Sequence, residues 1–110
     1  MAKKKNTYSF KKKRTYPLKD IKKLIKTKNI FPAGIRVIQD TNDLCLTIDQ
    51  AYEEILKLEP KDFYKSGTEP YNQQVWQDTY KKEIKGLRIY IKFKVFEDNF
   101  LLTSFKQDES

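Results

Sequence analysis

Every second residue from Leu87 to Val95 is apolar, which is the pattern of a β-strand with one face in a hydrophobic core. The residues between them form a basic second face: Arg88, Tyr90, Lys92 and Lys94. This alternation is the strongest local signal in the chain. It predicts a half-buried antiparallel sheet with one apolar face and one open, basic face.

Turn residues on both sides of this strand predict two hairpins. Lys85 and Gly86 suit a two-residue turn, because glycine readily adopts a positive φ. The implied pairs on the open face are Lys81–Tyr90, Thr79–Lys92 and Gln77–Lys94. On the other side, we expect a three-residue loop at Glu97, Asp98 and Asn99, with Asn99 left-handed. This loop implies the strand pairs Val95–Leu101, Phe93–Thr103, Ile91–Phe105 and Tyr90–Lys106. A slip of one residue would turn Gln77 or Lys106 into the core, so this register is a sharp prediction.

The first half of the chain predicts helices. Pro17 can open one that ends near Asn29, and Thr47 with Gln50 forms a capping box for another that stops before Pro60. Between them we expect a short strand at 35–38 and a turn at 40–43. The fold class is therefore α+β, an antiparallel β-sheet with the N-terminal helices packed on one face.

The net charge of +8 is concentrated near the start of the chain. Residues 1–30 contain 12 lysines and arginines and one acid, whereas residues 31–110 contain 11 and 14. We expect residues 1–14 to be a basic flexible arm, either a disordered tail or a contact to phosphates. Residues 15–107 have the length of a single domain.

The composition argues against several kinds of catalytic and metal site and against a membrane span. The chain has no histidine and one cysteine, which argues against histidine-dependent nucleases, catalytic triads and structural zinc. Cys45 lies between two leucines, so we expect a buried, inert thiol. We expect no metal and no cofactor. No apolar run is long enough for a membrane span, so we expect a cytoplasmic protein.

The predicted open face carries donors and positive charge but no carboxylate on the same strand face, which suits a phosphate better than a hard cation. RNA supplies its own nucleophile, the 2′-hydroxyl, so such a face could cleave RNA without a metal. The candidate catalytic residues are Lys65, Gln77, Tyr90 and Lys106, and the candidate RNA-binding residues are Lys81, Arg88, Lys92 and Lys94. Lysine and tyrosine titrate near pH 10, so a general base among them would need a lowered pKa.

Four blocks of sequence on these strands resemble the MqsR family of bacterial toxins, within the RelE-like messenger-RNA interferases. They are Asp62 to Ser66, Trp76 to Asp78 with Tyr80, Tyr90 to Lys92, and Ser104 to Lys106. The resemblance implies a RelE-like α+β fold, endoribonuclease activity on free mRNA, and a cognate antitoxin. It also implies that Lys65, Gln77, Tyr90 and Lys106 form the active site.

Two other readings of the same residues remain open. The chain could be a non-catalytic RNA- or DNA-binding module, which would leave RNA intact. It could also be an interaction protein whose basic arm docks on an acidic partner, with no effect on RNA.

Overall fold

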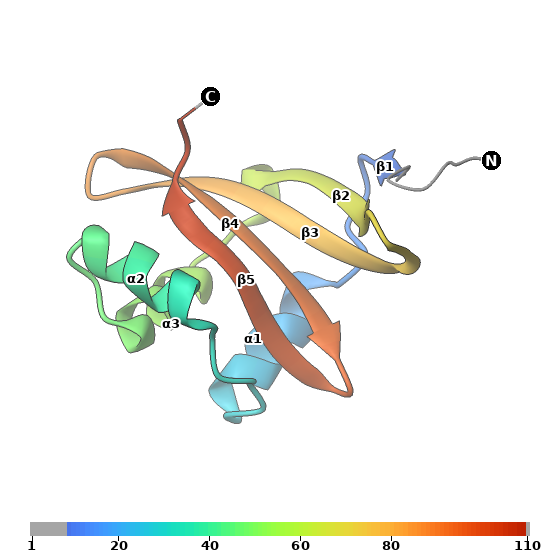
Figure 1. The fold of residues 1–110 in the computed structure, drawn as a ribbon, viewed down its shortest axis with the longest axis horizontal. Coiled ribbons are helices and arrows are strands. Elements are labelled where there is room, and N and C mark those ends of the chain that lie inside the picture. The colour runs from blue at the N-terminus through green and yellow to red at the C-terminus, as the bar shows by residue number, and fades with distance from the viewer. Residues whose placement is uncertain (1–8, 110) are drawn as a thin grey trace.

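The computed structural model describes residues 9–109 and has the expected α+β architecture (Figure 1). In this described part of the chain, three α-helices are joined to a five-stranded sheet in which every neighbouring pair is antiparallel. The strands follow one another across the sheet in chain order. The elements are β1 (Phe10–Lys11), α1 (Leu18–Lys26), α2 (Ile35–Asp43), α3 (Ile48–Ile55), a short 3₁₀ helix (Pro60–Asp62), β2 (Phe63–Glu69), β3 (Asn72–Ile84), β4 (Leu87–Phe96) and β5 (Asn99–Gln107).

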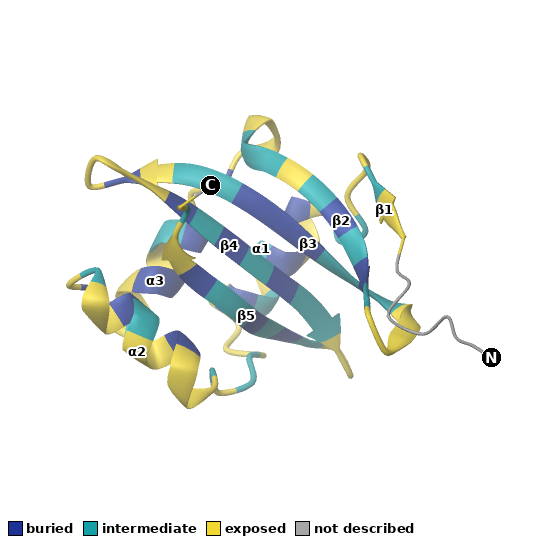
Figure 2. Cartoon of the chain, turned by 45° about the horizontal axis from the view of Figure 1, so that its top comes forward, coloured by how far each residue is buried: buried dark blue, intermediate teal, exposed yellow. Residues whose placement is uncertain are grey.

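The helices cover one face of the sheet, and buried residues alternate with more exposed ones along the central strands (Figure 2). We call the uncovered side the open face. The core lies between the helices and the sheet because each element turns its apolar side inward. The helices and the segments that follow them contribute Leu18, Ile21, Ile25, Val37, Leu46, Ala51, Tyr52, Ile55 and Leu58. The strands contribute Tyr80, Ile84, Ile89, Ile91, Phe93, Phe100, Leu102 and Phe105.

The β3–β4 hairpin confirms the predicted turn. Lys85 and Gly86 both have positive φ, at 55° and 78°, which matches the right-handed twist of the flanking strands. Lys81 pairs with Tyr90, and Thr79 with Lys92, as expected. The long strand β4 therefore presents its basic residues on the open face.

The β4–β5 hairpin differs from the prediction near its turn. Its loop has two residues, because Glu97 and Asp98 are the left-handed ones (φ 49° and 63°) and Asn99 begins β5. The pairs near the turn are therefore shifted by one residue, with Val95 opposite Phe100 and Phe93 opposite Leu102. A β-bulge between Lys92 and Phe93 absorbs the shift. Beyond it, the pairs Ile91–Phe105 and Tyr90–Lys106 are confirmed.

The segment from Ile35 to Asp43 is a helix, so the expected strand at 35–38 and turn at 40–43 are wrong. Val37 and Thr41, four residues apart, are its buried positions and face the core. The helix ends in a Schellman motif in which Cys45 is left-handed (φ 62°) and Leu46 N–H donates to Thr41 O at 3.0 Å. This turn projects Cys45 outward, so the thiol is exposed rather than buried.

The other two helices agree more closely with the sequence. Asn29 closes the end of α1, where its N–H donates to Leu24 O at 2.8 Å. The capping box at the start of α3 is confirmed, with bonds of 3.1 Å and 2.9 Å between Thr47 and Gln50. Across residues 9–109, no helix combines the length and apolar character that a membrane span requires.

The described part of the expected arm, residues 9–14, is attached to the sheet. Phe10 and Lys11 form β1 and pair with Gly67 and Ser66 of β2. Just after it, the buried carboxylate of Asp78 accepts hydrogen bonds of 2.9–3.1 Å from the backbone N–H groups of Thr15 and Tyr16. Residues 9–11 thus contact β2, residues 1–8 lie outside the described part of the chain, and the flexible arm at 1–14 stays a prediction.

Candidate active site

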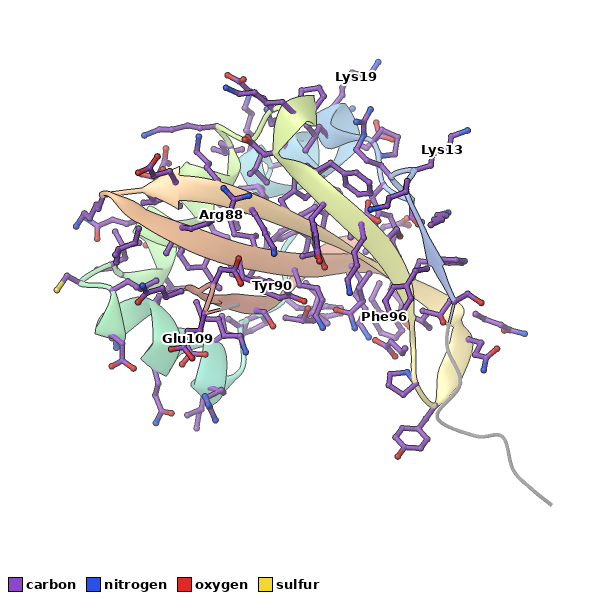
Figure 3. All side chains as sticks on the ribbon, turned by 90° about the horizontal axis from the view of Figure 1, so that it is seen from above. Lys13, Lys19, Arg88, Tyr90, Phe96 and Glu109 are labelled. Atoms are coloured by element: carbon purple, nitrogen blue, oxygen red, sulfur yellow. The ribbon has the colours of Figure 1, made fainter. Side chains whose placement is uncertain are left out.

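The open face brings the four candidate catalytic residues onto adjacent strands. Lys65 lies on β2, Gln77 on β3, Tyr90 on β4 and Lys106 on β5. Tyr90 pairs directly with Lys106, and the Lys106 Nζ lies 6.0 Å from the centre of the Tyr90 ring. Seen from above (Figure 3), Tyr90 lies over the middle of the sheet, whereas Lys13 and Lys19 lie beyond β2.

Two adjacent hollows lie on this face and share three residues: Lys65, Tyr90 and Lys92. The first, which we call the Phe10 hollow, extends toward β1 and also includes Gln77, Gly67 and Glu69. The second, the α2 hollow, extends toward α2 and also includes Tyr64, Lys81, Ser104 and Lys106. An elongated ligand could therefore cross the shared residues from one hollow to the other.

The lysines at the centre form no direct ion pair among the described residues, although Asp40, Asp43, Asp108 and Glu109 line the α2 hollow with them. Within residues 9–109, no carboxylate lies within 4.0 Å of the ammonium group of Lys65, Lys92 or Lys106. Instead, the Lys65 Nζ lies 4.2 Å from the centre of the Phe10 ring and 5.5 Å from that of Tyr64. Like charges on neighbouring strands repel one another, so a bound anion would relieve this repulsion.

Gln77 is held in place by two neighbours. Its Nε2 donates to Glu69 Oε2 at 2.9 Å, and its Oε1 accepts from the Thr103 hydroxyl at 2.5 Å. Thr103 lies in the bulged stretch of β5, which carries its side chain to the open face. An amide nitrogen has two N–H donors, so this arrangement orients Gln77 and leaves one donor for a ligand.

Carboxylates also border the face, contrary to the expectation that it has none. Glu69 pairs with Lys94 at 2.7 Å, and Asp108 pairs with Lys81 at 3.1 Å and more loosely with Arg88 at 3.9 Å. Three of the four candidate RNA-binding residues are thus at least partly neutralised, and Arg88 and Lys94 line neither hollow. Of these four candidates, only Lys92 lines the hollows without a carboxylate partner among the described residues.

Comparison with known proteins places this geometry in a family. A family model described as the motility quorum-sensing regulator, toxin of MqsA, matches residues 13–107. The mRNA interferase toxin MqsR of Escherichia coli (strain K12) is 30% identical over 90 residues, which cover 82% of this chain and 90% of the relative. The chain belongs to the MqsR toxin family.

The match to the MqsR family model covers the strands that carry the four candidates, but it does not cover β1. The matched range begins at residue 13, after Phe10 and Lys11. The Phe10 ring therefore belongs to a segment outside the family match, although it lines the same hollow as Lys65 and Gln77.

Several residues around this candidate site were not predicted from the sequence. Glu69 and Asp108 have a readable signal, because they follow Lys65 and Lys106 at even spacing and so share their side of the strand. Tyr64 reaches the open face beside a register irregularity between Phe63 and Lys65, and the Lys81 Nζ lies 3.9 Å from its ring centre. Such irregularities break the period of two, so residues near them are not found by alternation.

The arrangement can bind and polarise a phosphodiester. Lysine ammonium groups on three neighbouring strands can contact phosphate oxygens, and a positioned amide can fix their orientation. Within residues 9–109 there is no group of three histidine, cysteine, aspartate or glutamate side chains placed to hold a metal ion.

Proposed function

We propose that this chain is the toxin of a type II toxin–antitoxin system, a ribosome-independent endoribonuclease that cleaves single-stranded mRNA without a metal ion. The observation that carries this proposal is the convergence of Lys65, Lys92 and Lys106 beside Tyr90 on the open face, with no carboxylate partner among the described residues. The name of the E. coli relative, an mRNA interferase toxin, supports the same substrate.

The proposed reaction is an internal transesterification. The RNA 2′-hydroxyl attacks the adjacent phosphorus and loses its proton, the phosphorus–O5′ bond breaks, and the leaving O5′ takes up a proton. The products are a 2′,3′-cyclic phosphate and a 5′-hydroxyl. DNA lacks the nucleophile, so it would bind without being cleaved.

Each candidate has a proposed role in this reaction. Lys65 and Lys106 stabilise the charge that develops on the phosphorane, and one of them or Tyr90 transfers the proton. Gln77 positions the scissile phosphate or a base edge with its remaining N–H. Lys92, Lys81, Arg88 and Lys94 contact the RNA backbone, the last three after exchange of their carboxylate partners.

The proposal extends to partner and location. The description of the family model calls its members the toxin of MqsA. We propose that a cognate antitoxin binds this chain. We place the toxin in the cytoplasm, where mRNA is available. The result of cleavage would be inhibition of translation and growth.

The decisive experiment incubates the purified chain with a defined single-stranded RNA in excess chelator and maps the fragment ends. We expect cleavage by the parent and a loss of at least about 100-fold in rate for the Lys65→Ala, Lys106→Ala double variant, because removing one electrostatic group costs about 10²-fold in comparable sites. A Lys19→Ala, Lys26→Ala variant removes the same charge from exposed positions on α1 and should cleave normally.

Two results would count against the proposal. Intact RNA with the parent, together with retained binding, would favour the non-catalytic binding module. Cleavage that continues when the nucleotide at the cut site carries a 2′-deoxy sugar would exclude the 2′-hydroxyl as the nucleophile.

A further inference from the structure

The aromatic ring of Phe10 is placed where a ligand of the candidate site would meet it. It lines the Phe10 hollow together with Lys65, Gln77 and Tyr90, and it is 53% exposed. The Lys65 Nζ lies 4.2 Å from the ring centre. The ammonium group lies over the ring, and single-stranded nucleic acids use such combinations, with a base on the exposed ring surface and a phosphate on the cation.

The strand opposite Phe10 makes room for the ring. Gly67 pairs with Phe10, and a Cβ atom at Gly67 would lie 2.8 Å from one ring carbon and 2.9 Å from the next. Such contacts are too short for carbon atoms, which need about 3.5–4.0 Å. The ring therefore occupies the space that any larger residue at position 67 would fill.

The segment that carries Phe10 is fixed to the sheet at both ends. Before it, Ser9 N–H donates to Thr68 Oγ1 at 2.8 Å, and Thr68 N–H donates to Ser9 O at 2.9 Å. After it, Asp78 accepts from the backbone of Thr15 and Tyr16. A binding surface held this way is preorganised, so little order is lost when a ligand binds.

We infer that Phe10 forms a stacking platform for one nucleobase of a single-stranded RNA whose neighbouring phosphate is held by Lys65. The inference rests on the proposed RNA-cleaving function and adds a subsite to it. Because Phe10 precedes the range matched by the family model, family membership does not predict this subsite.

The test uses an oligoribonucleotide that cannot be cleaved because every ribose is 2′-O-methylated. The fluorescent base 2-aminopurine is placed at each position in turn, since stacking on an aromatic ring quenches it. We expect the parent to quench one position strongly. Phe10→Leu keeps an apolar side chain but should lose that quenching and bind roughly 5- to 150-fold more weakly, the range for loss of one stacked base.

Three further variants separate stacking from other effects. Phe10→Tyr retains the ring and should restore both quenching and affinity. Gly67→Ala leaves Phe10 in the sequence but displaces its ring, and should reduce the quenching. Phe96→Leu makes the same change at another exposed phenylalanine (48% exposed), at the far end of β4, and should have no effect.

The outcomes distinguish this inference from the proposed function. Unchanged affinity and quenching in Phe10→Leu would overturn the platform, whether or not the parent cleaves unmodified RNA. If Phe10→Leu weakens only the complex with the cognate antitoxin, the ring serves a protein contact and the inference is also overturned. Loss of stacking in Phe10→Leu, beside a parent that cleaves no RNA, would support the platform and reject the nuclease.

Discussion

Tyr80 is fully buried in the core, and within residues 9–109 its hydroxyl has no hydrogen-bond partner. The ring packs between Phe63 and Phe93, with centroid distances of 5.5 and 5.6 Å. An unsatisfied polar group in an apolar interior is unfavourable by about 1–3 kcal/mol. The ring of Tyr80 therefore supplies the stabilisation at this position, and the hydroxyl reduces it.

At the residue scale we predict that Tyr80→Phe does not destabilise the protein at pH 7 and stabilises it by up to about 1 kcal/mol. Burial raises the pKa of Tyr80, so the folded protein keeps the phenol proton after the unfolded chain has lost it. Stability is thus complete below about pH 10 and falls by up to about 1.4 kcal/mol per pH unit above it for this group. The phenylalanine variant lacks this loss.

Urea denaturation at pH 7 and pH 11 measures both effects. The advantage of Tyr80→Phe over the parent should grow between the two pH values. Tyr71→Phe, at an 85% exposed position, is the control and should track the parent. A variant less stable than the parent at pH 7 would show that the hydroxyl has a partner in solution.

Among the elements, the junction between β1 and α1 is held by a buried acid on β3. The Asp78 carboxylate accepts from the backbone N–H groups of both Thr15 and Tyr16, and the neighbouring Thr15 hydroxyl lies 2.8 Å from that of Ser66. A buried charge is stable only when it is well hydrogen-bonded, and these N–H groups provide that. Asp78 thereby couples β1 to the centre of the sheet.

We predict that Asp78→Asn lowers the free energy of unfolding by about 1.5–3 kcal/mol, because the amide has one acceptor oxygen and no charge. The measurement is urea denaturation combined with amide hydrogen exchange. The N–H groups of Thr15 and Tyr16 should lose protection, whereas that of Ile91, in the sheet centre, should lose much less. Unchanged protection at Thr15 and Tyr16 would contradict the proposed anchoring role.

The elements also show how far the sequence could be read. Alternation and a glycine turn predicted the β3–β4 register, because both are local signals. The bulge near Thr103 was not predictable, since it depends on how the far end of β5 packs. The sequence predicts a strand at 35–38 instead of the helix at Ile35–Asp43, because a short apolar run follows Pro32 and Gly34 and precedes turn residues at 40–43. The helix buries only Val37 and Thr41, so it has few apolar residues at helical spacing.

For the whole molecule, the distribution of charge matters more than its sum. The net charge of +8 comes from residues 1–30, and on the open face Glu69 and Asp108 form ion pairs with the basic residues at its margins. The pairing of Tyr90 with Lys106 could be predicted from the hairpin, whereas no predicted strand pair included Lys65. The acidic margin was missed, although even spacing from Lys65 and Lys106 places Glu69 and Asp108 on the same side.

We predict that Asp108→Asn strengthens RNA binding by releasing Lys81 and Arg88 to contact phosphates. For a single-stranded RNA, each new contact should steepen the plot of log affinity against log salt concentration by about 0.7. Titrations of the 2′-O-methylated RNA at several salt concentrations give this slope. Glu53→Gln changes the net charge equally at an exposed position on α3, so an equal steepening there would mean that only total charge matters.

β1 also determines how the sheet meets other molecules. Without it, β2 would be an outermost strand with unpaired backbone groups, and such strands recruit strands from neighbouring chains. The pairs Phe10–Gly67 and Lys11–Ser66 occupy part of that edge. A two-residue strand is too short to pair with much of another chain. Lys11 also places a positive charge at the edge where a strand from another chain would pair. By covering part of the β2 edge, the same short segment reduces the backbone available for edge-to-edge association of two sheets.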